Sequence, residues 1–480
     1  MRNFIIFSLY FLGYNISLAQ KNPMDDFVNS DNLTQASIGF LMRNLETGET
    51  VASYQPKICR NPASVTKLIT TATAMELLTD TFRFHTDLEM SGEIKDSVLY
   101  GNLYIRGGGD PSLESYHNPV KNLFYEKIID TISSLGIKRI QGSIIGDPSI
   151  FREDGAPMNW LVEDVGSSYS PTPSGLSAHD NLLSFVITSD STGFSLSKVS
   201  PHTQLFKPKF ELTQNKKMEP GWRFTKTDFS WEPIIRGNLP IGICQYLKTE
   251  LSEPAMLIAD SIRNRLIANG IAVDSVATTT RWTPSDPIRK VIYSYRSAPL
   301  KDIIRLTNHK SINLYAENIF LILSKTKDST ATCTNWTSAN VISRYWKSKG
   351  IDSNKIFQVD GSGMSMKNAI SPQFIVDMLT YMYKDSKYSK SFISTLPTAG
   401  RNGTVASFMK ETRLEGKAHI KSGSMERVQN FAGYIKANNK WYAFSIMVSN
   451  FTGARAAVKK QISTLLNELI VNDNQLIKQP

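Results

Sequence analysis

The chain has 480 residues, of which 41% are hydrophobic and 20% are charged, and its formal net charge is +11. These values are typical of a globular protein with two or three domains, and they exclude a chain too small to build a core without disulfides or metals. Lysine and arginine are spread along the sequence, which favours a solvated basic surface over a patch for an anionic envelope polymer or membrane surface. We expect no nucleic-acid partner, because no recognition motif occurs.

The first residues predict a secretory signal peptide, residues 1–19. Arg2 supplies a positive charge, residues 4–18 are mostly apolar, and Ser17-Leu18-Ala19 has the small-x-small pattern of a cleavage site. A membrane anchor is the alternative, which the break at 13–15 disfavours because a spanning helix needs about 20 mostly apolar residues. We therefore expect a secreted, periplasmic protein, and peripheral association with the envelope stays open.

A hairpin and a long helix follow the predicted signal. Residues 36–45 and 50–54 are strand-like and flank the turn sequence Glu46-Thr47-Gly48-Glu49. Asn61 is a favourable N-cap residue, and Pro62 is favoured at the first helical position. The pattern therefore predicts a helix over 62–78.

The stretch from 86 to 288 has a different character. Short strand-like pieces, such as 99–105 and 140–145, alternate with glycine, proline and serine, and one helix is predicted over 260–269. Residues 283–287 have the composition of a linker. We expect one or two inserted, mostly β domains over 86–288.

The remaining chain predicts helices over 300–308 and 312–324. Three strands are then predicted over 417–423, 430–436 and 441–450, with Asn438-Asn439 at a hairpin turn. The last predicted element is an amphipathic helix over 456–469. The sequence thus predicts one discontinuous α/β domain, residues 20–85 and 289–472, followed by a polar tail, residues 473–480.

Cysteine and histidine give no sign of a disulfide framework or a metal site. The chain has three cysteines, an odd number, and they lie far apart in the sequence: Cys59, Cys244 and Cys333. Whether any two of them form a disulfide stays open. No H-E-x-x-H or C-x-x-C pattern occurs, and we expect no metal and no other cofactor.

Ser64 and Lys67 form the first of three patterns that suggest catalytic chemistry. Residues three apart on a helix share a face, so the two side chains can touch. A serine hydroxyl needs a base to become a nucleophile, and a lysine amine can be that base when burial and a second cation lower its pKa. Lys421 is a candidate for that second cation. Ser64 also lies near a predicted helix N-terminus, where free N–H groups favour developing negative charge.

The second pattern, Ser311-Ile312-Asn313, lies where another helix is predicted to begin. Ser311 can protonate a leaving amine. Asn313 can hold both the substrate amide and the Lys67 side chain.

The third pattern, Lys421-Ser422-Gly423-Ser424, lies on a predicted strand. Lys421 and Ser422 can bind a substrate carboxylate, and Gly423 leaves room for close backbone approach. The N–H groups of Ser64 and Ser424 can form an oxyanion hole, an interaction worth about 3–4 kcal/mol per donor. Each pattern alone occurs often by chance, but the three in this order are the trio used by penicillin-binding proteins and serine β-lactamases.

When the residues around the three patterns are included, the chain resembles the class C low-molecular-mass penicillin-binding proteins, the D-Ala-D-Ala carboxypeptidase/endopeptidase family S13. The resemblance runs from about residue 35 to residue 466, and its most specific feature is the long insertion between the first two patterns. The family-like stretches are Pro62-Ala63-Ser64-Val65-Thr66-Lys67, Gly107-Gly108-Gly109-Asp110-Pro111-Ser112, Ser311-Ile312-Asn313-Leu314-Tyr315-Ala316-Glu317, Asp360-Gly361-Ser362-Gly363-Met364-Ser365, Ala399-Gly400 with Gly403-Thr404, and Ala432-Gly433-Tyr434.

The resemblance implies a penicillin-recognising α/β fold of the α+β type: a mainly antiparallel five-stranded sheet flanked by helices, with inserted β-rich domains. It also implies a serine peptidase that cleaves peptidoglycan stem peptides through a Ser64 acyl-enzyme and is acylated by β-lactams. Ile312 departs from the family's usual Asp, and Ser422 and Ser424 replace Thr residues. Asp360 and Ser362 are candidates for supporting residues.

Two rival functions remain on the sequence alone. A β-lactamase or esterase can use the same serine, but it needs a dedicated deacylating group that is not evident. A non-catalytic cell-wall binding protein can keep the fold, although the intact catalytic residues argue against it. The balance of carboxypeptidase and endopeptidase activity and the oligomeric state stay open.

Overall fold

The computed structural model describes residues 22–117, 123–152, 155–204, 208–214, 221–225, 234–280, 287–326, 329–330 and 332–476. The predicted signal peptide and most of the predicted linker lie outside these residues. No helix in these ranges is long and apolar enough to span a bilayer.

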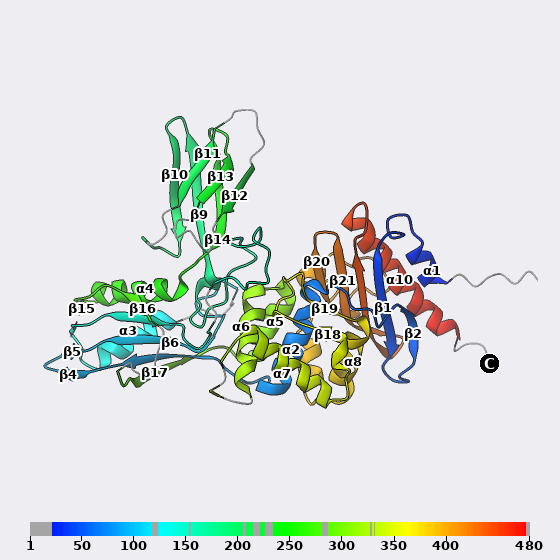
Figure 1. Cartoon of the computed structure of the whole chain (residues 1–480), viewed down its shortest axis with the longest axis horizontal. Helices are drawn as coiled ribbons and strands as arrows, with labels where there is room; N and C mark the ends of the chain where they lie inside the picture. Colours follow the sequence, from blue (N-terminus) through cyan, green and yellow to red (C-terminus); the bar gives the residue numbers. More distant parts are fainter. Residues whose placement is uncertain are drawn as a thin grey trace, which may run out of the picture.

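A five-stranded antiparallel sheet forms the centre of the region outside the insertion, in the order β2-β1-β22-β21-β20 (Figure 1). The predicted hairpins are present, and both Asn438 and Asn439 adopt the left-handed backbone conformation that a tight turn needs. The strands are β1 (Ser37–Asn44), β2 (Thr50–Tyr54), β20 (Ala418–Met425), β21 (Val428–Ala437) and β22 (Lys440–Ser449).

The sheet is buried on both faces because its strands alternate apolar side chains between two cores. On β22, Phe444 and Ile446 point into one core, whereas Ala443 and Met447 point into the other. This alternation is the period-2 pattern of a strand with both faces covered.

Helices cover both faces of the sheet. One face packs against α1 (Pro23–Val28) and α10 (Arg455–Leu476), which lie side by side in Figure 1. The other face packs first against α8 (Pro372–Lys384) and, beyond it, the remaining helices of the region. These are α2 (Thr66–Leu78), α5 (Leu300–Lys310), α6 (Asn313–Ile322), α7 (Asn335–Ser348) and α9 (Ser389–Ser394), with the short helices η1 (Ala63–Val65), η3 (Leu323–Thr326) and η4 (Ser353–Lys355) and the strand pair β18 (Ile356–Phe357) and β19 (Ala369–Ile370). The short helix η5 (Gly403–Val405) buries Val405 in the core that α1 and α10 cover.

The insertion contains two units with separate cores. The first unit pairs its strands as β16-β8-β6-β3-β17 and β15-β7-β5-β4, and both sheets enclose helices in one apolar core. Its elements are β3 (His85–Met90), β4 (Glu93–Lys95), β5 (Val98–Tyr100), β6 (Leu103–Gly107), α3 (Phe124–Ser134), β7 (Arg139–Ile140), β8 (Ile144–Asp147), α4 (Pro254–Ala268), β15 (Ala272–Val273), β16 (Thr278–Thr279) and β17 (Lys290–Arg296).

The second unit is an all-β sandwich that projects from the first (Figure 1). Its two three-stranded sheets, β10-β9-β14 and β11-β13-β12, share a small core that includes Phe185, Ile187 and Leu247. Its elements are η2 (His179–Asn181), β9 (Leu182–Asp190), β10 (Gly193–Ser200), β11 (Lys209–Thr213), β12 (Gly221–Thr225), β13 (Ile234–Asn238) and β14 (Cys244–Glu250).

Two boundaries and the composition of the first unit differ from those expected. Strand β17 follows residue 288, yet it pairs with β3 and so extends the sheet of the insertion to Arg296. The first unit is also less purely β than expected, since α3 and α4 pack in its core. The expected polar tail begins too early, because Asp473 belongs to α10 and accepts hydrogen bonds from Lys440 Nζ (3.1 Å) and Tyr442 OH (2.6 Å).

Candidate active site

Ser64 lies in the single turn of η1, directly before α2. The helix predicted from Pro62 therefore begins as a tighter turn, and its α-helical part starts at Thr66. Asn61 holds this turn, since its Oδ1 accepts a hydrogen bond from Ala63 N (2.8 Å) and its carbonyl accepts one from Asn430 Nδ2 on β21 (2.9 Å). The turn that carries Ser64 is thus fixed to the central sheet.

Lys67 is fully buried and directs its amine to three oxygen atoms. Its Nζ donates to Ser64 Oγ at 3.0 Å, Asn313 Oδ1 at 2.6 Å and Ser362 O at 2.7 Å. Burial lowers the pKa of Lys67 to about 7, against the opposing effect of the negative charges of Glu317 and Asp360. A lysine with this pKa is neutral in a large fraction near neutral pH, so it can accept the proton of the serine hydroxyl.

Lys421 and Ser311 form a second contact in the site. Lys421 Nζ donates to Ser311 Oγ at 2.9 Å and to Ser422 O at 2.8 Å. Burial lowers the pKa of Lys421 well below its ordinary value, and the nearby charge of Lys67 lowers it further. Ser311 ends α5 in the left-handed conformation, with φ of 58°, and this turn directs the chain into α6.

Asn313 connects the site to the insertion. Its Oδ1 is the acceptor for Lys67, and its Nδ2 donates to the carbonyl of Tyr169 at 2.7 Å. Tyr169 is missing from the candidates predicted from the sequence. No sequence signal could have found it, because the contact uses a backbone carbonyl in a loop of the insertion.

The third pattern lies on the edge strand β20, next to η1. The Ser422 hydroxyl lies 2.8 Å from Thr404 Oγ1, and Ser424 is exposed. Gly423 packs against the turn so closely that a Cβ atom there would stand 2.7 Å from Pro62 O and 3.0 Å from Ser64 N. Glycine is therefore needed at this position for the strand to approach the Ser64 N–H.

Two buried carboxylates hold the loop behind Lys67. Glu317 accepts hydrogen bonds from Gly361 N (3.0 Å) and Ser362 N (2.8 Å), and Ser362 is the residue whose carbonyl contacts Lys67. Burial and the neighbouring charge of Asp360 raise the pKa of Glu317 to about 8.

Asp360 accepts hydrogen bonds from several donors, among them Gly363 N at 2.8 Å, Ser365 N at 2.6 Å and Trp160 Nε1 at 3.2 Å. Trp160 belongs to the insertion, so after Tyr169 it is a second residue of that region that contacts the site. The role of Glu317 was missed, although it lies in the same motif as Ser311 and Asn313.

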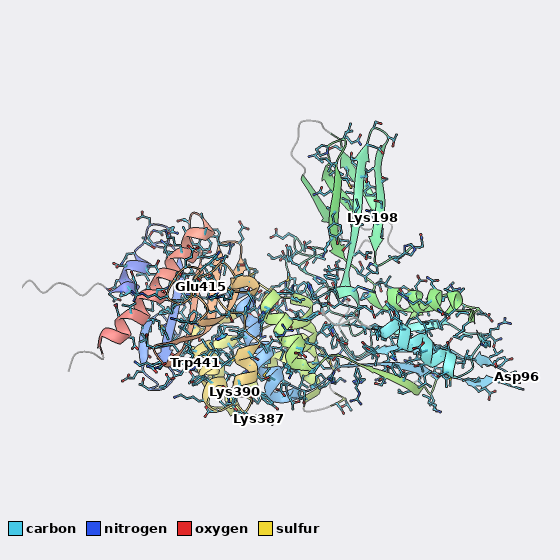
Figure 2. All side chains as sticks on the ribbon, turned by 180° about the vertical axis from the view of Figure 1, so that it is seen from behind. Asp96, Lys198, Lys387, Lys390, Glu415 and Trp441 are labelled. Carbon is cyan, nitrogen blue, oxygen red and sulfur yellow. The ribbon has the colours of Figure 1, made fainter. Side chains whose placement is uncertain are left out.

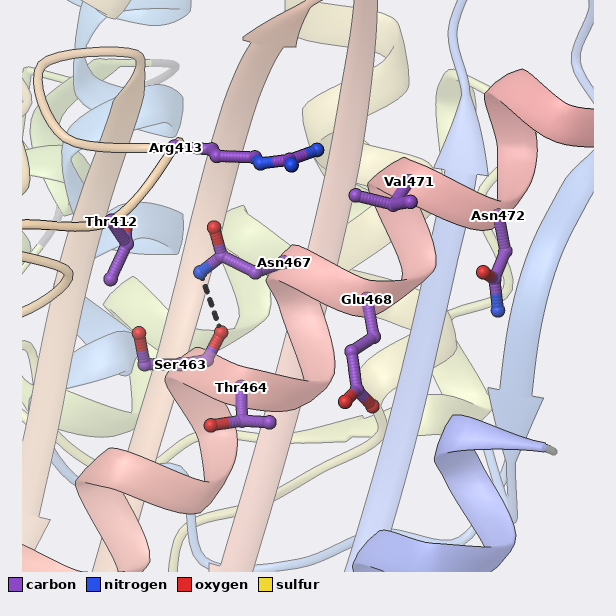
Figure 3. Close-up of a pocket in the computed structure, with 8 residues that line it drawn as sticks. All are labelled: Thr412, Arg413, Ser463, Thr464, Asn467, Glu468, Val471 and Asn472. Carbon is purple, nitrogen blue, oxygen red and sulfur yellow. Dashed lines mark hydrogen bonds between the residues drawn. The ribbon is translucent and has the colours of Figure 1, made fainter.

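The structure thus brings Lys67 into direct contact with both Ser64 and Asn313, and Ser311 into contact with Lys421. Gly423 packs on the Ser64 turn, with Ser422 and Ser424 on the same strand. The cavity in Figure 3 lies elsewhere, between α10 and the loop of Thr412 and Arg413, and has a volume of about 360 Å³. None of its lining residues belongs to the three patterns. Among the described residues, no group of three or more His, Cys, Asp or Glu side chains is placed to hold a metal ion.

Comparison with known proteins identifies the family. Residues 20–469 match the family described as D-Ala-D-Ala carboxypeptidase 3 (S13). The chain is 23% identical over 457 residues to the D-alanyl-D-alanine carboxypeptidase DacB of Haemophilus influenzae, covering 92% of each chain. It is 25% identical over 479 residues to the D-alanyl-D-alanine carboxypeptidase of Actinomadura sp., covering 93% of this chain and 84% of that protein.

The fold is also found in a solved structure. The crystal structure of penicillin binding protein 4 (dacB) from Haemophilus influenzae superposes with a TM-score of 0.80, at 20% identity, over 94% of this chain and 100% of that chain. The same protein in complex with a β-lactam gives a TM-score of 0.75. This confirms the predicted fold class. Because the family match spans nearly the whole sequence, the chain belongs to the D-Ala-D-Ala carboxypeptidase 3 (S13) family of serine peptidases.

Proposed function

We propose that this chain carries out the D-alanyl-D-alanine peptidase reaction of its family in the periplasm, with Ser64 as the nucleophile. The observation that supports this assignment best is the 3.0 Å contact between Lys67 Nζ and Ser64 Oγ, made by a buried lysine whose pKa is about 7. A base of that pKa, within hydrogen-bond distance of the hydroxyl, meets both requirements of general base catalysis.

The reaction begins when neutral Lys67 accepts the proton of Ser64 Oγ, which attacks the carbonyl carbon of the penultimate D-alanine. The N–H groups of Ser64 and Ser424 stabilise the oxyanion of the tetrahedral intermediate. Lys421 and Ser422 bind the terminal carboxylate of the substrate.

Collapse of the intermediate breaks the peptide bond. Ser311 donates its proton to the departing amine, and the hydrogen bond from Lys421 places Ser311 for this transfer. The proton that Lys67 took from Ser64 then passes to Ser311, so Lys67 is neutral again before water attacks. Water then hydrolyses the acyl-enzyme on Ser64 and restores the free serine. The substrate is a peptidoglycan stem peptide, or a cross-link in which D-alanine supplies the carbonyl.

β-Lactams are expected to act as covalent inhibitors of the same serine, as the complex of the Haemophilus influenzae protein suggests. Opening of the lactam ring leaves the leaving group tethered to the acyl-enzyme. The tethered group hinders the approach of water, so the adduct on Ser64 persists.

The test is mass spectrometry of the intact protein after incubation with penicillin, together with an assay of D-alanine release from a pentapeptide. The wild type should gain one penicilloyl adduct that maps to Ser64, and Ser64→Ala should lose both the adduct and D-alanine release. Ser53→Ala, at an exposed serine on β2, is the matched control and should behave as the wild type. An adduct or D-alanine release that persists in Ser64→Ala would overturn the proposal.

A further inference from the structure

A basic and aromatic cluster lies beside the second catalytic pattern, made from three separate parts of the chain. Its members are Lys310 at the end of α5, Tyr116 and His117 in the loop after β6, and Lys248 on β14 of the sandwich. Lys248 Nζ stands 4.5 Å from the centre of the Tyr116 ring, and the Tyr116 and His117 rings are 4.8 Å apart. We call these four residues the basic cluster.

The cationic side chains of the basic cluster surround one region of the surface. Burial, and then the positive charges of Lys310 and Lys248, lower the pKa of His117 to about 4, so both ammonium groups act on the same imidazole. Within the described part of the chain, neither lysine forms an ion pair or donates a hydrogen bond. Asp180 is the nearby carboxylate, and it is already engaged by Ser115 Oγ at 2.6 Å.

The loop that carries Tyr116 and His117 is held in place by the catalytic region. Tyr116 N donates to Asp180 Oδ2 at 3.2 Å, and His117 N donates to Ser115 Oγ at 3.0 Å. The same Ser115 hydroxyl accepts a hydrogen bond from Tyr315 OH on α6 at 2.7 Å. The backbone of Tyr116 and His117 is therefore fixed relative to Asn313, which begins α6, and this lowers the entropic cost of binding a ligand beside them.

We infer that the basic cluster binds carboxylates of the peptidoglycan strand that leaves when a cross-link is cleaved. This inference rests on the proposed function, in which Ser311 protonates the departing amine. The leaving group must then lie on the side of Ser311, and Lys310 is the adjacent residue.

The leaving group is a single D-alanine when a stem peptide is cleaved and a whole peptide strand when a cross-link is cleaved. The strand fits the basic cluster better than the single D-alanine does. A single D-alanine ends at its one carboxylate, which Lys421 and Ser422 already bind. A cross-linked strand continues beyond the cleaved bond and carries further carboxylates, which two unpaired lysines complement. Tyr116, with 48% of its surface exposed, offers an apolar face for the peptide backbone between those charges.

The test compares two purified substrates, a monomeric pentapeptide and a D-alanyl cross-linked dimer, in the wild-type protein and in Lys248→Ala. The ratio of kcat/KM for the dimer to kcat/KM for the monomer should fall about tenfold in Lys248→Ala, mainly through a higher KM for the dimer. Lys387→Ala is the control, because Lys387 is an exposed lysine that likewise lies near an aromatic ring, 5.0 Å from the centre of the Tyr388 ring, and Figure 2 shows it far from the sandwich. Its ratio should equal that of the wild type.

Salt provides a second measurement that needs no variant. Raising the ionic strength from about 0.05 to 0.5 M should raise KM for the dimer several-fold more than KM for the monomer, since salt screens exposed charges. An unchanged ratio in folded Lys248→Ala, or a wild type that cleaves the monomer but not the dimer, would overturn this inference alone. A wild type that neither releases D-alanine nor forms an adduct at Ser64 would instead overturn the proposed function.

Discussion

Gly423→Ala tests whether β20 must approach the Ser64 turn as closely as the structure has it. The added methyl would stand 2.7 Å from Pro62 O, 2.9 Å from Val65 N and 3.0 Å from Ser64 N, and all three atoms are backbone. A carbon needs about 3.5 Å from such atoms, so the strand and the turn must separate by roughly half an ångström to one ångström. A displacement of about 1 Å at a catalytic centre costs on the order of 100-fold in rate.

We therefore expect the second-order rate of acylation by a fluorescent penicillin to fall about 100-fold in Gly423→Ala. The free energy of unfolding should fall by only about 1–3 kcal/mol, which is the usual cost of overpacking. Gly136→Ala is the control, because its φ of 71° strains an alanine while, among the described residues other than its chain neighbours, no atom lies within 4 Å of the new methyl. It should lose stability without losing acylation. An acylation rate in Gly423→Ala within threefold of the wild type would refute the reasoning.

Three further predictions concern the contacts around Lys67 and α6. Below pH 7 the acylation rate should fall about tenfold per pH unit and above it should level off, because Lys67 with a pKa of about 7 accepts a proton only when neutral; a profile that stays flat from about pH 5 to pH 9 would contradict this. Asn313→Ala should slow acylation by up to about tenfold, since it removes the 2.6 Å hydrogen bond that positions the Lys67 amine, worth about 0.5–1.5 kcal/mol when that amine is neutral. Stopped-flow fluorescence measures this rate, and a rate equal to that of the wild type would contradict the prediction. Tyr315→Phe should lower the free energy of unfolding by about 1–3 kcal/mol in a denaturant titration, because it breaks a buried bond to Ser115; no loss would show that this bond contributes nothing.

The central sheet and its helices could be predicted because local patterns specify them. Alternation along residues 441–450 and the Asn438-Asn439 turn identify β22 and its hairpin without knowledge of their partners. The insertion shows where such patterns stop being informative. Strand β17 was assigned to the wrong side of the domain boundary because its partner, β3, lies about two hundred residues earlier, and periodicity does not identify partners.

In the candidate site, too, some features could be predicted from the sequence and others could not. The family trio supplied Ser64, Lys67, Ser311, Asn313 and residues 421–424, and the structure places these residues together, while their catalytic roles stay predictions. These residues could be predicted because the motifs specify the type of side chain at each position. The contacts of Lys67 with the Ser362 carbonyl and of Asn313 with the Tyr169 carbonyl were not predictable, because any residue can offer a carbonyl.

Helix α6 explains why an enzyme of this kind would keep a large insertion next to its nucleophile. Four of its side chains point to different partners: Asn313 to Lys67, Tyr315 to Ser115, Glu317 to the N–H groups of Gly361 and Ser362, and Asn318 to the carbonyls of Gly109 and Ser174. Two of these partners belong to the site, and two belong to the insertion. A buried helix that is hydrogen-bonded on both sides cannot shift without breaking bonds in each, at a cost of about 1–3 kcal/mol for every group left unpaired. The insertion therefore helps to fix the position of Asn313, and through it the lysine that contacts Ser64.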